Sequence, residues 1–203
     1  MNYLAHMYLA GDSEESLVGN MLGDFVKGRI GDEFPPGVAE GIRTHRKIDA
    51  FTDSHERVIS SKRLVSRERR RFSGIIVDLA FDHILALNWG DYSELPLGDF
   101  IQRTYSLLAA NAGLMPPRPR EVLRFMIEED WLGSYRRLDG IGRALDRIAV
   151  RVERRFGRKN SLPGAVDEIS RNYNALEENF RAFFPELVSF VEEYSKGTQT
   201  NQR

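Results

Sequence analysis

The chain has 203 residues, a formal net charge of −1 from 29 basic and 30 acidic side chains, and no cysteine. This length can bury a full core without a disulfide or zinc staple, and the lack of cysteine excludes thiolate catalysis and cysteine zinc sites. The sequence has neither a basic leader nor an apolar run of about 20 residues, so we expect a soluble cytoplasmic protein that binds no membrane.

Apolar residues recur at helical spacing along nearly the whole chain, which predicts an all-α bundle forming a single domain over residues 1–203. The expected helices of the first half span 2–10, 13–25 (after Asp12 or Ser13 as N-cap), 36–54, 56–71 (continuous with the helix before it or separate) and 75–87. Those of the second half span 97–110, 119–129, 131–156 with a weak point at Gly140 and Gly142, and 163–184 with a bend or restart at Pro185, and residues 196–203 are expected to fray.

The four histidines are confined to the first 83 residues of the chain, and aspartates accompany them. Carboxylates rarely lie among apolar residues unless they are paired or metal-bound. We therefore expect a metal site within residues 1–90. Of the four, His55 lies near a helix end and is expected at the surface or as a supporting residue.

One candidate stripe lies on the expected helix over residues 36–54. Residues His45, Asp49 and Asp53 follow one another at intervals of four, so they project along one helix face and could hold a cation. Arg46 lies about 100° further around the helix, where it could contact a phosphate bound to the metal. The alternative is a surface helix with His–Asp pairs and a solvated arginine.

A second candidate lies in the apolar helix over residues 75–87. Asp78 and Asp82 repeat the four-residue spacing, and two unpaired carboxylates in such a helix would be costly. A divalent ion or an arginine is expected to neutralise them, and His83 offers an imidazole ligand next to Asp82. The alternative is a purely structural pairing with an arginine.

Two further residues, His6 and Asp24, lie on the first two expected helices. Each alone would be a satisfied buried polar group, but together with the other helices they complete a ring of ligands. Imidazole and carboxylate ligands without thiolate suit manganese, iron, zinc or magnesium, and the share of oxygen favours Mn²⁺ or Mg²⁺. Such an ion acidifies water and neutralises phosphate oxygens, so phosphoryl chemistry is expected.

Four motifs carry a family resemblance that extends over essentially the full length. They are M-N-Y-L-A-H-M-Y-L-A, S-L-V-G-N-M-L-G-D-F-V-K-G, F-P-P-G-V-A-E-G-I-R-T-H-R-K-I-D-A-F-T-D and D-L-A-F-D-H-I-L-A-L-N-W. In these motifs the chain resembles the acyl carrier protein phosphodiesterases, a divergent branch of the HD phosphohydrolase superfamily. The resemblance implies an HD-domain-like helical bundle with additional C-terminal helices. It also implies a manganese-dependent enzyme of fatty acid biosynthesis that removes 4′-phosphopantetheine from the serine of holo-acyl carrier protein.

The resemblance also implies site residues. By match to the family motifs, the residues expected to bind metal or act in catalysis are Asp24, His45, Asp49, Asp82 and His83. His6 and Asp78 are the second-ranked candidates. Arg46 or Lys47 is expected to stabilise charge on the phosphate, and His45 or His83 to protonate the leaving serine oxygen where it is not a ligand. The HD superfamily has a contiguous His-Asp pair, whereas this chain has Asp82-His83 in the reverse order.

Basic residues gather in three blocks, 62–71, 118–124 and 151–159. Each alone is typical of a solvated helix face, whereas together they fit an acidic partner. The expected partner is the small, acidic acyl carrier protein rather than nucleic acid, with helices over 134–195 serving as scaffold or docking surface. Two alternatives stay open: an HD-type hydrolase of a nucleotide or other small phosphoester, and a non-catalytic helical adaptor for an acidic partner.

Overall fold

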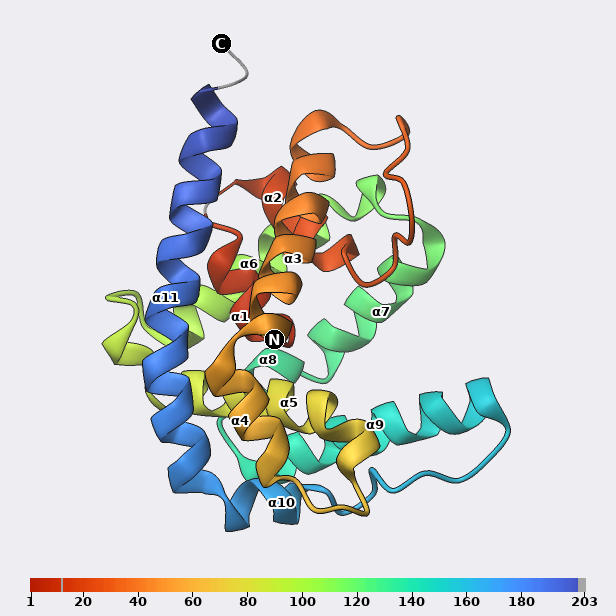
Figure 1. Ribbon diagram of the computed structural model, residues 1–203. Coiled ribbons are helices and arrows are strands. Elements are labelled where there is room, and N and C mark those ends of the chain that lie inside the picture. The colour runs from red at the N-terminus through yellow and green to blue at the C-terminus, as the bar shows by residue number, and fades with distance from the viewer. Residues whose placement is uncertain (12, 201–203) are drawn as a thin grey trace.

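The computed structural model describes residues 1–11 and 13–200, and across them it confirms the all-α class (Figure 1). Eleven α-helices and three short 3-10 helices form within this part of the chain, and no strand does. The helices are α1 Tyr3–Leu9, α2 Glu14–Leu22, α3 Pro36–Ser54, α4 Glu56–Leu64, α5 Ser73–Leu87, α6 Leu97–Ala110, α7 Pro117–Glu128, α8 Trp131–Ser134, α9 Leu138–Phe156, α10 Val166–Arg171 and α11 Tyr173–Thr200; the 3-10 segments are η1 Arg70–Phe72, η2 Trp89–Asp91 and η3 Ala112–Leu114.

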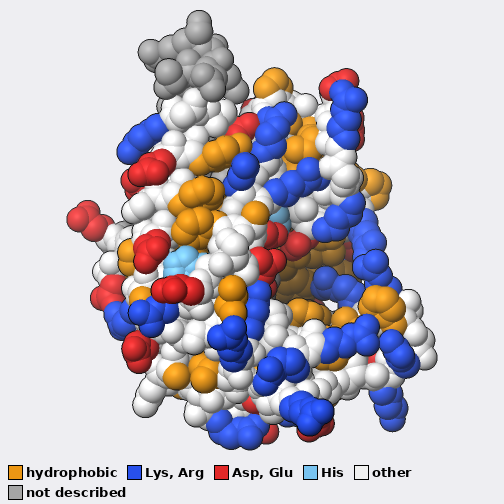
Figure 2. Space-filling view, in the orientation of Figure 1, with side chains coloured by type: hydrophobic (Ala, Val, Ile, Leu, Met, Phe, Trp, Pro, Cys, Tyr) orange, Lys and Arg blue, Asp and Glu red, His pale blue; other side chains and the backbone are white. Residues whose placement is uncertain are grey.

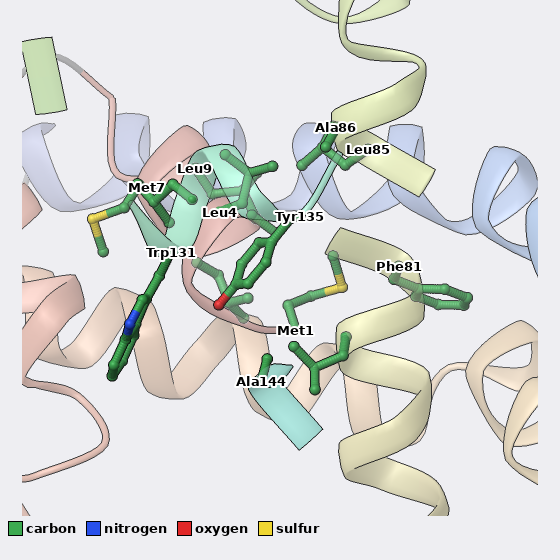
Figure 3. Close-up of a cluster of buried hydrophobic side chains, with 14 of the residues drawn as sticks. Met1, Leu4, Met7, Leu9, Phe81, Leu85, Ala86, Trp131, Tyr135 and Ala144 are labelled. Atoms are coloured by element: carbon green, nitrogen blue, oxygen red, sulfur yellow. The ribbon is translucent and has the colours of Figure 1, made fainter. Parts of the chain in front are cut away.

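The core is built around α5, which contacts α1, α4, α9, α10 and α11. Its sequence is apolar on nearly every face, and a helix of that kind is stable only when neighbours cover it. Phe81 and Leu85 of α5 are fully buried, and Figure 3 shows them in the same cluster as Met1, Leu4 and Tyr135. The N-terminal helix is thereby held in the middle of the molecule, while the long α11 lies along one side of it (Figure 1).

The pair α2 and α3 packs at very short range through two glycines. A Cβ atom at Gly19 would lie 2.3 Å from the Val38 carbonyl oxygen, and one at Gly41 would lie 2.7 Å from the Ser16 carbonyl oxygen. Because no other side chain fits there, the two backbones can approach each other only with glycine at both positions. This close packing fixes the end of α2 against the middle of α3.

Several helix limits differ from the sequence prediction. The expected helix over 131–156 is divided into α8 and α9, and the break falls before Gly140, whose Cβ would collide with the Ser134 carbonyl oxygen at 2.0 Å. The stretch 163–184 is likewise divided at Asn172. The expected helix over 56–71 ends at Leu64, separately from α3.

Pro185 does not restart the last helix, because α11 continues through it to Thr200. The neighbouring Phe183, Phe184 and Leu187 are fully buried, and this packing outweighs the hydrogen bond that a proline removes. Residues 196–200 are helical rather than frayed, and 201–203 lie outside the described residues. At the other end, Ser13 caps α2, and Asp12 also lies outside the described residues.

Within the described chain, no helix is both long enough and apolar enough to cross a bilayer.

Candidate metal centre

Two histidines and one aspartate converge where α1 meets α3. The imidazole rings of His6 and His45 stack with their centroids 3.9 Å apart and their planes 17° apart. One carboxylate oxygen of Asp49 lies 3.2 Å from Nε2 of His6, and the other lies 3.2 Å from Nε2 of His45. Among the described residues these three form the group that could hold a metal, with candidate ligand atoms all within 4.8 Å of one another.

Asp24 stands at the edge of this group. It follows the end of α2, its side chain is 56% exposed, and its Oδ1 lies 3.8 Å from Nε2 of His45. Gly23 makes this approach possible, because a Cβ there would lie 2.1 Å from Cγ of the His45 ring. The cluster is therefore buried on the histidine side and open to solvent on the Asp24 side.

Arg46 holds the segment that carries Asp24. Its guanidinium donates a hydrogen bond to the Val26 carbonyl oxygen at 2.8 Å, which ties the loop after α2 to α3. In this arrangement Arg46 positions the loop, and the phosphate contact that the sequence predicts for it stays a prediction. Asp53, the third member of the α3 stripe, instead pairs with Lys62 at 2.7 Å.

The protonation states of the cluster suit a cation. Burial is the main cause that lowers the pKa of His6, so its imidazole is neutral near pH 7. Burial of Asp49 opposes its charged form, but the hydrogen bonds from His45 and His6 outweigh burial and lower the pKa of its carboxyl. Neutral imidazole and ionised carboxylate are the forms that bind metals.

The donor set also fits a divalent ion on its own chemistry. Two nitrogen donors and carboxylate oxygens, with Asp24 available as a further ligand, match the needs of Mn²⁺, Fe²⁺ or Zn²⁺. Nδ1 of His6 and Nδ1 of His45 are buried without a hydrogen-bond partner in the described structure. His6, His45 and Asp49 are the residues that would hold such an ion, and the ionised Asp49 carboxylate would balance its positive charge.

The aspartates of α5 do not join this cluster. Asp82 is fully buried and accepts hydrogen bonds from the backbone amides of Asn2, Leu4 and Ala5 at 3.3, 2.7 and 3.4 Å. These amides belong to the first turn of α1 and have no partner within the helix, so Asp82 caps α1 from a distance. Asp78 instead pairs with the Met1 amino group at 3.0 Å.

His83 also lies outside the cluster. It is buried, and its Nδ1 lies 2.6 Å from the carbonyl oxygen of Tyr135, to which it donates a hydrogen bond. This contact anchors the turn between α8 and α9 to α5. His55 caps α4 by accepting a hydrogen bond from the Arg57 amide and also contacts Glu186 at 3.3 Å.

A cavity of about 690 Å³ opens beside the cluster, and Asp24 belongs to its lining. Figure 2 shows it as a hollow with a hydrophobic floor, basic side chains around its rim and acidic side chains at one edge. The basic residues that line it are Lys27, Arg118, Arg147, Arg151 and Arg155, and the floor includes Tyr3, Ile75, Trp131, Tyr135, Ala144 and Ile148.

Sequence reasoning missed three features of this region. Gly23 is essential to the approach of Asp24 and His45. Its signal was the spacing of four between Gly19 in α2 and Gly23 at the C-cap of α2, which predicts a face in close contact with another helix. The ion pair between the Met1 amino group and Asp78 could not be predicted from residue spacing. The cavity lining combines segments distant in sequence, so only its basic blocks were visible.

Comparison with known proteins identifies the family of the chain. Residues 1–187 match the family model described as acyl carrier protein phosphodiesterase. The chain is 37% identical over 189 residues to an acyl carrier protein phosphodiesterase of Serratia proteamaculans, and 35% identical to those of an Enterobacter species and Shigella boydii; each match covers 93% of this chain and 96% of the relative. No solved structure gives a significant match. The chain belongs to the acyl carrier protein phosphodiesterase family.

Proposed function

We propose that this protein hydrolyses the phosphodiester that joins 4′-phosphopantetheine to the serine of holo-acyl carrier protein, leaving the apo form. The observation that carries the proposal is the position of the His6, His45 and Asp49 cluster beside a cavity lined with basic side chains. A cation site at the edge of a positively charged cavity is suited to a phosphoester, which both parts neutralise. Family membership supplies the substrate class.

The ion of this proposal is Mn²⁺, with Mg²⁺ or another divalent ion as substitutes, held by His6, His45 and Asp49 and approached by Asp24. When bound, it would neutralise phosphoryl charge and acidify water. The exposed Asp24 is the carboxylate placed to orient water at this edge, since it lies 3.8 Å from His45 and lines the cavity. Lys27 lines the same edge and adds positive charge for the phosphate oxygens.

Water supplies the oxygen that joins phosphorus, the bond from phosphorus to the serine oxygen breaks, and the serine oxygen takes up a proton. Serine alkoxide is a poor leaving group, so a proton donor matters for the rate. We do not assign that proton to His83, because its ring is 3% exposed and is bonded to the Tyr135 carbonyl. His45 is a ligand of the ion in this proposal, so the proton that the serine oxygen takes up comes from water at the open Asp24 edge of the cluster.

Docking of the acidic carrier protein falls to two of the three basic blocks. Arg118, Arg151 and Arg155 are exposed and line the cavity. In the 62–71 block, by contrast, some basic side chains already form ion pairs within the protein. In that block Lys62 pairs with Asp53, and Arg69 with the buried Glu168. Basic side chains around the cavity steer an acidic partner and chiefly raise its rate of association.

The same proposal includes a cytoplasmic role in fatty acid biosynthesis and descent from the HD phosphohydrolase superfamily. The support for the latter is the histidine and aspartate pair on α3, His45 and Asp49, placed opposite a histidine from another helix.

Mass spectrometry of the intact carrier protein tests the proposed reaction. Holo-acyl carrier protein incubated with the purified protein and Mn²⁺ should lose the mass of 4′-phosphopantetheine and regain the mass of its apo form. Parallel incubations should contain a panel of nucleotides in place of the carrier protein. If holo-carrier protein stays intact while a nucleotide is hydrolysed, the proposal is wrong and the nucleotide hydrolase is correct.

A further inference from the structure

The cavity beside Asp24 is larger than a metal site requires. Its volume of about 690 Å³ falls within the range of sites that enclose small organic ligands, about 300–1,000 Å³. Its lining comes from α1, the loop after α2, α5, α7, α8 and α9. Asp24 belongs both to the cavity lining and to the edge of the metal cluster. One end of a ligand in the cavity would therefore lie beside the cluster.

The lining has two chemical characters. Trp131, Tyr3, Ile148 and Ala144 offer an apolar and aromatic surface, whereas the charged lining is basic except for Asp24 within the described residues. An anionic group attached to an uncharged chain fits such a surface, because the anion is neutralised at one place and the chain buries apolar area at another.

One wall of the cavity is already rigid. The Arg147 guanidinium lies 4.6 Å from the centre of the Trp131 ring and contacts Glu129 at 3.3 Å. The Trp131 indole N–H donates to the same Glu129 carboxylate at 2.9 Å, and the Tyr3 ring lies 6.2 Å from the indole. A wall whose groups fix one another binds a flexible ligand at a lower entropy cost.

We propose that this cavity binds the 4′-phosphopantetheine arm of the substrate, with its phosphate at the Asp24 and Lys27 edge and its pantetheine chain over Trp131 and Ile148. The proposal rests on the proposed function and adds to it the subsite for the prosthetic group. It makes Trp131, Ala144 and Ile148 determinants of substrate binding, and it separates recognition of the arm from docking of the carrier protein at the exposed arginines.

Fluorescence of Trp131 measures occupancy of the cavity directly. The chain has two tryptophans, and the other, Trp89, is buried and donates to the Leu95 carbonyl, so Trp89→Phe leaves Trp131 as the reporter. The Mg²⁺-loaded Trp89→Phe protein should be titrated with 4′-phosphopantetheine, pantetheine and inorganic phosphate. We expect a saturable change with phosphopantetheine, at least tenfold weaker binding of pantetheine, and no change with phosphate.

Ala144→Leu fills the cavity floor and should weaken phosphopantetheine binding at least tenfold and raise KM for holo-carrier protein, with binding of Mn²⁺ unchanged. Val150→Leu is the matched control, since Val150 is 47% exposed on the same helix and does not line the cavity. Ile148→Ala, which enlarges the cavity, serves where Ala144→Leu does not fold, and it should also weaken binding.

Each contrary outcome has a defined meaning. If phosphate alone gives the same fluorescence change, the cavity is a simple anion site and the proposal is wrong. If phosphopantetheine binds by calorimetry without a change at Trp131, or the cavity variants keep wild-type KM, the arm binds elsewhere and this inference fails while turnover of holo-carrier protein stands. If the wild-type protein does not release phosphopantetheine at all, the proposed function itself fails.

Discussion

Gly23 of the α2 end and His45 of α3 are in such close contact that a Cβ on the glycine would lie 2.1 Å from Cγ of the imidazole. The same two helices also meet through Gly19 and Gly41, so their close approach depends on glycine at these positions. Asp24 follows Gly23 directly. The glycine therefore sets the distance between two candidate ligands without being a ligand itself.

Gly23→Ala should push the His45 ring away from Asp24 and Asp49 and weaken Mn²⁺ binding at least tenfold. Calorimetric titration of the purified variant measures this. Gly98→Ala is the control, because a Cβ at Gly98 on α6 meets nothing within 4 Å and should leave Mn²⁺ affinity unchanged. Equal affinities for Gly23→Ala and wild type would show that the ring position does not matter for the ion.

Asp82 should make the stability of the protein depend on pH. Burial raises the pKa of its carboxyl to about 7, against the attraction of the Met1 ammonium and the hydrogen bonds from the Leu4 and Asn2 amides. Between the unfolded value of 3.8 and about 7 the folded protein binds more protons than the unfolded chain. The stability that Asp82 contributes is therefore present at low pH and lost as pH rises through this range, by at most about 1.4 kcal/mol per pH unit.

Urea unfolding of wild type and Asp82→Asn isolates this contribution, since groups distant from Asp82 titrate alike in both proteins. The difference in unfolding free energy, wild type minus variant, should decrease from pH 5 to pH 7 and level off near pH 8. A difference that stays constant or grows with pH would mean that Asp82 is already ionised in the folded protein at pH 5.

Asp24→Ala distinguishes an enzyme from an adaptor. The side chain is 56% exposed, so its removal should cost little stability and leave binding of the carrier protein within about twofold. Turnover should fall at least a hundredfold, because the group that faces both the cluster and the cavity is lost. Binding by surface plasmon resonance and turnover by mass spectrometry give the two values, and retained turnover would remove Asp24 from the site.

The sequence predicted helices better than partners. The spacing of His45 and Asp49 places both on one face of α3, and the structure confirms that placement. The same spacing in α5 gave Asp78 and Asp82 as ligands, yet in the structure they hold the Met1 amino group and the free amides of α1. Helical spacing predicts which residues share a helix face, but it does not predict which residues elsewhere in the chain pack against that face.

The helix ends and the cavity illustrate the same limit. Pro185 normally ends a helix, but the burial of Phe183, Phe184 and Leu187 against the core continues α11 through it. The sequence predicted a weak point at Gly140, but the helix breaks before it, between Ser134 and Leu138. Gly140 itself lies just inside α9, where the lack of a side chain lets it approach Ser134 closely. The cavity combines six segments whose residues have no common spacing, so only their charge was visible in the sequence.

The central claim is that the cluster of His6, His45 and Asp49 releases phosphopantetheine with the help of a divalent ion, and a comparison of two aspartates four residues apart on α3 tests it most directly. Asp49 contacts both histidines, whereas Asp53 pairs with Lys62 and is 75% exposed. The measurement is the mass of holo-acyl carrier protein after incubation with Mn²⁺ and either Asp49→Ala or Asp53→Ala. We predict that Asp49→Ala leaves the carrier protein intact, while Asp53→Ala and wild type convert it to the apo form at similar rates and lose this activity on chelation by EDTA. Conversion by Asp49→Ala at the wild-type rate would contradict the account.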